Sequence, residues 1–224
     1  MKIFNPDSPF MTVLSRIADF MIINVFTLVL CVPIITSGAA LTACYYTMLK
    51  IRRDEDSGIV KLYFKSFKEN FKQAAVITLI VIALMGIPAY ILGVVNANFK
   101  DAVPTVARVL LAGAVLLVAF LFSMVFPVLS RFSNTIGGTI KAGIMVAVSN
   151  PPRSFLIIIM TVAPFYLLYN FPVILPVVLM FGISLPAFLS VCLYNKQFIK
   201  MEERANEAHG IPVPGSEDEH IFND

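Results

Sequence analysis

The chain contains uninterrupted apolar stretches that are long enough to cross a lipid bilayer. Residues 74–95 and 109–129 carry no charged side chain, and the charge-free stretch 154–195 is long enough for two crossings. A helix needs about 20 predominantly apolar residues to span a hydrocarbon layer of roughly 30 Å. These stretches therefore predict an all-α fold, a polytopic transmembrane helix bundle.

Six membrane segments are expected, with five as the alternative. The expected segments are 15–33, 36–50, 73–95, 104–127, 154–170 and 172–194. Residues 15–50 either cross the membrane once or form a partly re-entrant hairpin, whose second arm is short for a full crossing. The transmembrane domain covers residues 1–200. Residues 201–224 form an acidic tail, and their polar, Pro/Gly-punctuated composition predicts disorder.

The distribution of charge predicts the orientation of the chain. Residues 1–200 have a net charge of +9, whereas residues 201–224 have a net charge of −6. Seven Lys/Arg lie in residues 50–72 and three in 196–204, beside predicted spans, which the positive-inside rule assigns to the cytoplasm. With a hairpin at 15–50, both termini are cytoplasmic. Topology explains the basic charge better than nucleic-acid binding does, so no nucleic-acid partner is expected.

Two cytoplasmic segments have the pattern of amphipathic helices. In residues 58–72, an aromatic stripe formed by Phe64, Phe67 and Phe71 runs beside a stripe of lysines, Lys61, Lys65, Lys68 and Lys72. This segment is either an interfacial helix that anchors the bundle in the lipid headgroups or a docking helix for a partner protein. The second segment, 128–150, either lies on the membrane or packs beneath the bundle.

A few polar or irregular positions lie within the first apolar region. Asp19 is an intramembrane acid, which is by default a functional candidate, although Arg16 one turn earlier offers it a local ion pair. Asn24 is expected to hydrogen-bond another helix. Pro33, Thr36 and Gly38 form the irregular turn that is the candidate for lining a cavity, because broken backbone in membranes survives only beside protein or water.

The sequence offers little for catalysis. It lacks a phosphate-binding loop, an HExxH zinc motif and a GxSxG nucleophile elbow, and both histidines lie in the polar tail. The three cysteines, Cys31, Cys44 and Cys192, lie in or beside apolar segments without metal-ligand spacing and are interpreted as packing thiols. We expect no enzyme activity, no cofactor and no metal.

The N-terminal part resembles the YesL-like family of bacterial integral membrane proteins. Three stretches carry the resemblance: the turn PIITSG at 33–38, the small-residue and tyrosine segment at 39–50, and the basic helix FKSFKENFKQ at 64–73. The resemblance is specific over about residues 4–75. Genes of this family tend to lie beside carbohydrate ABC transporters and glycoside hydrolases in Gram-positive bacteria. The resemblance therefore implies a bacterial plasma-membrane location and an auxiliary role in carbohydrate uptake, and it supplies no catalytic or binding residues.

Three functional hypotheses follow. The first is a non-enzymatic accessory subunit that binds the permease and ATPase subunits of a sugar ABC transporter through its cytoplasmic helices. The second is a transporter or permease subunit in its own right, with a pathway near Pro33–Gly38. The third is a membrane scaffold or sensor. Besides these partners, the lipid bilayer surrounds the chain, and self-association into a homo-oligomer is compatible with each hypothesis.

Overall fold

A computed structural model describes residues 9–53, 58–98, 103–132 and 135–209 of the chain. Every regular element in these residues is a helix, so the predicted all-α class is confirmed. Within the described ranges, four helices are long and apolar enough to cross a membrane, or five if one bent pair counts as a single span. The protein is therefore a multi-pass membrane protein. Of the six expected segments, residues 36–50 form a helix too short to be counted among these spans.

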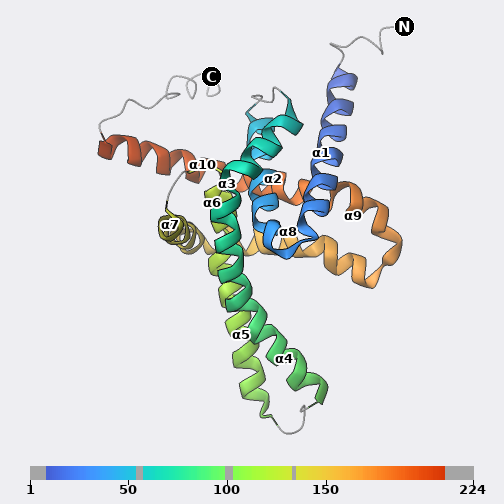
Figure 1. Ribbon diagram of the computed structural model, residues 1–224, viewed down its shortest axis with the longest axis vertical. Coiled ribbons are helices and arrows are strands. Elements are labelled where there is room, and N and C mark those ends of the chain that lie inside the picture. Colours follow the sequence, from blue (N-terminus) through green and yellow to red (C-terminus); the bar gives the residue numbers. More distant parts are fainter. Residues whose placement is uncertain (1–8, 54–57, 99–102, 133–134, 210–224) are drawn as a thin grey trace.

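The first two helices form a hairpin. α1 (Pro9–Cys31) and α2 (Ser37–Arg52) are joined by the short 3-10 helix η1 (Ile34–Thr36). The residue before a proline is disfavoured in the helical conformation, and α1 accordingly ends just ahead of Val32-Pro33. The start of α1 and the end of α2 lie at the same end of the molecule (Figure 1). Residues 15–50 thus turn back on themselves rather than running through in one direction.

α2 lies at the centre of the fold. Eleven of its 16 residues are buried, and it packs against α1, α3, α6 and α10. Its small residues allow the neighbouring backbones to approach closely, as is common between membrane helices. Gly38 shows how close this contact is, because a Cβ atom there would overlap the Thr78 hydroxyl and lie 2.6 Å from the Phe126 ring.

The predicted amphipathic helix and the third apolar segment are one continuous helix. α3 (Ile59–Val81), the π-helical turn η2 (Ile82–Gly86) and α4 (Ile87–Asn98) form 40 residues without a break. Pro88 explains the widened turn, because it has no N–H to donate and its ring crowds the carbonyl of Leu84 four residues earlier. Gly38, at the start of α2, contacts this helix at Ala74 and Thr78, and the helix continues for 20 residues beyond Thr78, roughly 30 Å.

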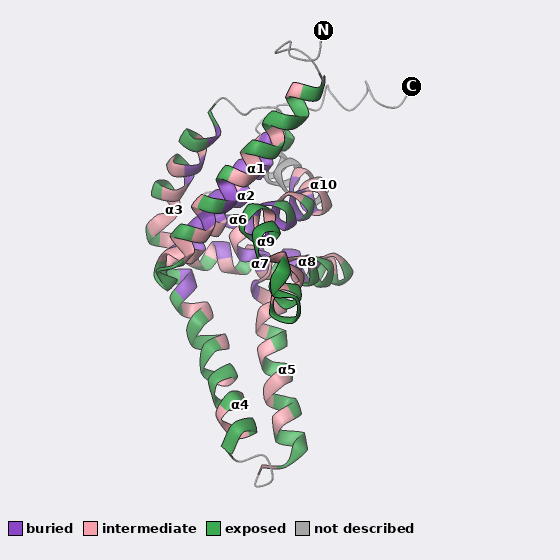
Figure 2. Cartoon of the chain, turned by 90° about the vertical axis from the view of Figure 1, so that its right-hand side faces the viewer, coloured by how far each residue is buried: buried purple, intermediate pink, exposed green. Residues whose placement is uncertain are grey.

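The chain returns along this long helix. α5 (Thr105–Phe122) runs beside α4 to form an arm that projects from the rest of the molecule, and α6 (Val125–Leu129) continues it after a short break (Figures 1 and 2). Most residues of the arm are exposed, as Figure 2 shows. Since these residues are almost all apolar, the exposed surface of the arm matches a lipid environment.

The remaining helices lie across this long axis. α7 (Ile136–Ser149) is seen end-on in Figure 1, and α8 (Pro151–Asn170) and α10 (Ser184–His209) run crosswise there and end-on in Figure 2. η3 (Pro172–Ile174) and α9 (Leu175–Phe181) connect α8 to α10.

Three expected boundaries differ in the structure. The single helix expected over 128–150 is interrupted between α6 and α7, where Gly137 and Gly138 lie at the start of α7 behind the Thr135 cap rather than in mid-helix. The segment 172–194 is bent by 57° between α9 and α10. α10 also continues through residues 201–209, for which the composition predicts disorder, whereas 210–224 lie outside the described residues.

Candidate functional site

An open cleft of about 810 Å³ lies between α1 and the start of α3. We call it the α1–α3 cleft. It is lined by residues from both helices: Ser15, Asp19 and Ile22 of α1, and Gly58, Ile59, Val60, Lys61, Phe64, Lys65 and Lys68 at the start of α3. Three other cavities between the described helices are smaller. Five of the predicted site residues lie in the cleft: Asp19, Lys61, Phe64, Lys65 and Lys68.

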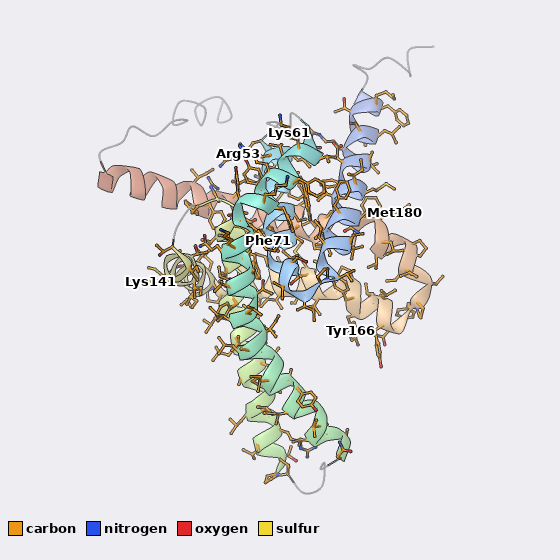
Figure 3. The ribbon with its side chains drawn as sticks, in the orientation of Figure 1. Arg53, Lys61, Phe71, Lys141, Tyr166 and Met180 are labelled. Carbon is orange, nitrogen blue, oxygen red and sulfur yellow. The ribbon has the colours of Figure 1, made fainter. Side chains whose placement is uncertain are left out.

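The wall contributed by α3 is basic. Lys61, Lys65 and Lys68 follow one another at spacings of four and three, which brings their side chains onto one face of the helix. All three are exposed. Figure 3 shows Lys61 near Arg53, at the end of the molecule where α1 begins. Cationic side chains therefore concentrate at this end.

The wall contributed by α1 is mixed. Ser15, Asp19 and Ile22 recur at the same helical spacing and present a hydroxyl, a carboxylate and an apolar side chain to the cleft. Asp19 is half-buried there. With three lysines and one aspartate, the residues that line the cleft carry a net charge of +2.

Packing beneath the cleft fixes the position of α3. Gly58 precedes α3 with a φ of 81°, a left-handed conformation that favours glycine. The Phe64 ring lies 5.2 Å from the Phe26 ring of α1, between centroids. The buried Tyr63 hydroxyl lies 3.1 Å from Thr27 Oγ1 and donates to the Ala40 carbonyl at 3.3 Å. Hydrogen bonds thus join α1, α2 and α3 directly under the cleft.

The aromatic stripe predicted as a docking surface lies on the inner side of α3. Phe64, Phe67 and Phe71 are half-buried and pack against the core, with 5.6 Å between the Phe67 and Phe71 ring centroids. Lys72, by contrast, is exposed but does not line the cleft. The two stripes therefore have different surroundings: the lysines face outward, and the aromatics pack within the chain.

Asn24 makes the expected hydrogen bonds to another helix, at the break between α9 and α10. Its Nδ2 donates to the Val178 and Leu179 carbonyls at 3.1 and 2.8 Å. Its Oδ1 accepts from the Ile183 and Ser184 amides at 2.7 and 2.9 Å. Since Asn24 is fully buried, one side chain satisfies backbone groups on both sides of the bend. Sequence reasoning selected Asn24 but not the break that it bridges.

The turn at residues 33–38 closes on itself. Thr36 Oγ1 donates to the carbonyls of Leu30 and Pro33, and Ser37 Oγ donates to the Ile34 carbonyl at 2.7 Å. The apolar side chains of the turn, Ile34 and Ile35, are exposed, and Val32 just before the turn is 80% exposed. Within the described part of the chain, Pro33, Thr36 and Gly38 line neither the α1–α3 cleft nor the three smaller cavities.

These three smaller cavities lie at the irregular points of the helices. Cavities of about 260 and 330 Å³ adjoin Tyr45 of α2 and Thr161 of α8, the first beside the α9–α10 bend and the second beside η2. A third cavity, of about 270 Å³, lies between α8 and α9–α10 and is lined by apolar side chains and by Gly182. No cluster of His, Cys, Asp or Glu able to hold a metal ion occurs among the described residues.

Comparison with known proteins gives one match. The profile of a family described as a protein of unknown function, DUF624, matches residues 20–91, which cover the second half of α1, all of α2, α3 and η2, and the start of α4. No curated protein and no solved structure matches the chain. The matched region contains the α1–α2–α3 unit and the basic wall of the cleft. Ser15 and Asp19 precede it.

Proposed function

We propose that this protein is a non-enzymatic accessory subunit of the bacterial plasma membrane that binds a sugar ABC transporter. The resemblance to the YesL-like family supports the connection with carbohydrate uptake. The proposal needs a surface that a permease or ATPase subunit can contact, and α7 offers one.

The observation that carries the proposal is the way in which α7 is held. Gln73 Nε2 of α3 donates to Thr139 Oγ1 at 2.8 Å. A Cβ atom on Gly143 would lie 2.8 Å from Val125 Cα, so α7 and α6 are in backbone contact. One face of α7 is therefore fixed against the bundle. The opposite stripe, Lys141, Met145 and Val148, is exposed at spacings of four and three.

A rigid helix with an apolar stripe and one charge is a common form of docking element. Met145 and Val148 are 59% and 54% exposed, which makes them available for contact with a partner. Figure 3 shows Lys141 projecting on the side of the molecule away from α1, well separated from Arg53. We propose that the partner binds along this stripe of α7.

The cavities favour an accessory role over an independent sugar permease. A sugar pathway needs several hydrogen-bonding groups, because leaving sugar hydroxyls unpaired is costly. The residues lining the three smaller cavities offer only Cys31, Tyr45, Ser123 and Thr161 as polar side chains. An independent transporter, and a membrane scaffold or sensor, are the alternatives, and the proteins that co-purify with the chain distinguish them from an accessory subunit.

The proposed orientation places both termini in the cytoplasm. Arg52 ends α2 and Arg53 follows it, and Figure 3 shows Arg53 and Lys61 at the end of the molecule where α1 starts. The positive-inside rule assigns such a basic end to the cytoplasm. In this orientation, the cleft and the start of α1 are cytoplasmic.

Affinity purification tests the proposed function. The tagged protein, extracted from its native membrane in a mild detergent, should bring down ABC permease and ATPase subunits in stoichiometric amounts by mass spectrometry. The double variant Lys141→Glu/Met145→Ala should lower their recovery about tenfold, since disrupting a charged contact and an apolar contact together is expected to cost about 1.4 kcal/mol or more.

Two matched variants control for damage to the fold. Arg53→Glu reverses an exposed charge elsewhere, and Leu116→Ala truncates a residue that is 67% exposed on the α4–α5 arm. Both should retain the partner. Recovery of the protein alone, or only as a homo-oligomer, would contradict the accessory role and favour a transporter or scaffold. Equal loss in the α7 variant and in both controls would contradict the assignment to α7.

A further inference from the structure

We propose that the α1–α3 cleft is a binding site for an anionic phospholipid with a hydroxyl-bearing headgroup, of the phosphatidylglycerol class. The site does not depend on the proposed partner, because it lies between α1 and α3 rather than on α7. Its lining combines three exposed lysines with apolar side chains, and it opens at the basic end of a membrane helix bundle.

The charges select an anion. Lys61, Lys65 and Lys68 stand on one face of α3, and Asp19 is the one acid among the described residues that line the cleft. Ammonium groups bind phosphate oxygens as flexible point charges, and basic pockets between membrane helices on the cytoplasmic side are suited to anionic headgroups. A zwitterionic lipid has no net charge, so the cleft's net charge of +2 favours an anionic lipid over it.

The opposite wall suits a headgroup with hydroxyls. Ser15 and Asp19 lie one helical turn apart and provide hydrogen-bonding oxygens across from the lysines. A glycerol hydroxyl can donate to the Asp19 carboxylate while the phosphate faces the lysines. A bare phosphate monoester, by contrast, would bring negative charge toward Asp19 without offering it a comparable donor.

An apolar stripe leads away from the cleft along α1. Ile22 lines the cleft, and Val25 and Val29 follow it at spacings of three and four on one face of α1, while Val32 comes directly after the last residue of the helix. These side chains are 41%, 48%, 60% and 80% exposed, in that order. The helical part of the stripe, Ile22 to Val29, extends about 10 Å along α1, so the first part of an acyl chain fits against it.

This continuity favours a lipid over a soluble anion or an acidic peptide. Val60 also lines the cleft and is 43% exposed beside Lys61, so apolar and cationic groups alternate around the opening. A soluble anion would use only the lysines and would leave the apolar stripe without a role. A phospholipid uses both.

Tryptophan quenching tests the proposal, because the natural chain contains no tryptophan. A Val60→Trp variant places a single fluorophore at the cleft, and a Leu116→Trp variant places one on the lipid-exposed arm as a control. Each protein is reconstituted in phosphatidylcholine vesicles that contain a small fraction of either phosphatidylglycerol or phosphatidylcholine with brominated acyl chains. Bromine quenches tryptophan at short range.

The expected result is preferential quenching at the cleft. Brominated phosphatidylglycerol should quench the Val60→Trp variant more strongly than brominated phosphatidylcholine, whereas the two lipids should quench the Leu116→Trp variant equally. The Val60→Trp variant is then combined with Lys61→Gln, Lys65→Gln and Lys68→Gln. Its apparent affinity for phosphatidylglycerol should fall about 100-fold, as expected for the loss of three lysines near a membrane surface. The matched set Arg53→Gln, Lys72→Gln and Lys141→Gln removes three charges outside the cleft and should leave the preference intact.

Three results would overturn the proposal. Equal quenching of the Val60→Trp variant by both lipids would show that the cleft does not select an anionic lipid. Loss of the preference in the matched set outside the cleft would assign it to the overall charge of the molecule. The third result concerns a soluble anion. The fluorescence of the Val60→Trp variant would respond to inorganic phosphate but not to chloride at the same ionic strength, and it would show no preference for phosphatidylglycerol. That result would assign the cleft to a soluble anion.

Discussion

At the scale of single residues, Asn24 has an effect larger than its size suggests. The bend between α9 and α10 leaves the Leu179 carbonyl and the Ile183 and Ser184 amides without the partners of a continuous helix, and Asn24 bonds all three as well as the Val178 carbonyl, which also accepts from the Gly182 amide. A buried backbone group without a partner is costly in a membrane protein, where water is scarce. The bend is therefore stabilised by a side chain from a helix about 160 positions away in the sequence.

Asn24→Ala should destabilise the protein by about 2–3 kcal/mol, because the Leu179 carbonyl and the Ile183 and Ser184 amides lose their partner and a small cavity forms. The measurement is the thermal unfolding of the purified protein in detergent, followed by circular dichroism. Asn98→Ala is the matched control, since the exposed Asn98 side chain bonds only the Val94 carbonyl in its own helix. A melting temperature for Asn24→Ala equal to that of the control would contradict the role given to this residue.

The sequence identified Asn24 but not its partners, and the reason is physical. Prolines at 176 and 186 predict kinks in this region, yet the break lies between them at Gly182-Ile183. The location of the break depends on the tertiary contact with Asn24. The break also needs a glycine at position 182, because a Cβ atom there would lie only 2.6 Å from the Val178 carbonyl oxygen. Neither local periodicity nor hydropathy records a contact of this kind.

At the scale of elements, α3 shows which part of an amphipathic pattern can be read from sequence. The spacing of the aromatics and of the lysines correctly predicted a helix with two stripes. It could not assign the environment of the aromatic stripe, because the surfaces that face lipid, protein core or a docked partner are all apolar in a membrane protein. In the structure the aromatic side chains pack against the core. Phe64 lies beside Phe26 of α1, and Phe67 and Phe71 pack against a buried group of six residues: Ala39, Ala74, Ile77, Phe122, Val125 and Leu129.

Truncating a side chain of the aromatic stripe should therefore lower stability far more than truncating one of the lysines. Phe67→Ala removes a half-buried ring that packs against two groups of buried residues, one that includes Tyr63 and one that includes Ile77. It should therefore lower the free energy of unfolding by about 2 kcal/mol. Lys65→Ala changes an exposed side chain and should shift it by less than about 0.5 kcal/mol. Unfolding by a denaturing detergent, measured for both variants at equal protein concentration, tests this difference. If Phe67→Ala were as stable as Lys65→Ala, the aromatic stripe would not be part of the core.

α2 offers a second lesson at this scale. Its short length left it open whether residues 15–50 cross once or turn back. Its Gly, Ala and Thr content is typical of a helix packed on several sides, and the structure places it in contact with four other helices. Composition thus predicts burial in a membrane protein better than hydropathy does.

At the scale of the whole molecule, the protein has a basic end, where the α1–α2 hairpin begins and ends, and a long apolar arm formed by α4 and α5. Gly38 of the α1–α2 hairpin meets the long helix at Ala74 and Thr78, and α3–α4 continues beyond this contact through Asn98. The number of apolar segments was predicted closely, but the crosswise placement of α7, α8 and α10 depends on tertiary packing and was not.

The hairpin makes a topological prediction that is independent of the partner. Single cysteines are introduced in a variant in which Cys31, Cys44 and Cys192 are replaced by alanine. Val13→Cys near the start of α1 and Arg53→Cys after α2 should react with a membrane-impermeant thiol reagent from the same side of sealed vesicles. Val103→Cys, at the connection between α4 and α5, should react only from the opposite side, because the arm separates it from the basic end by a bilayer's thickness.

Vesicles of the two orientations make this test decisive. Right-side-out and inverted preparations should give complementary patterns, and the side that labels Arg53→Cys also tests the cytoplasmic orientation that the positive-inside rule predicts. Labelling of Val13→Cys and Arg53→Cys from opposite sides would mean that residues 15–50 cross the membrane once. In that case α1 and α2 could not form the hairpin that supports the cleft, since both of its ends must lie on one side of the bilayer.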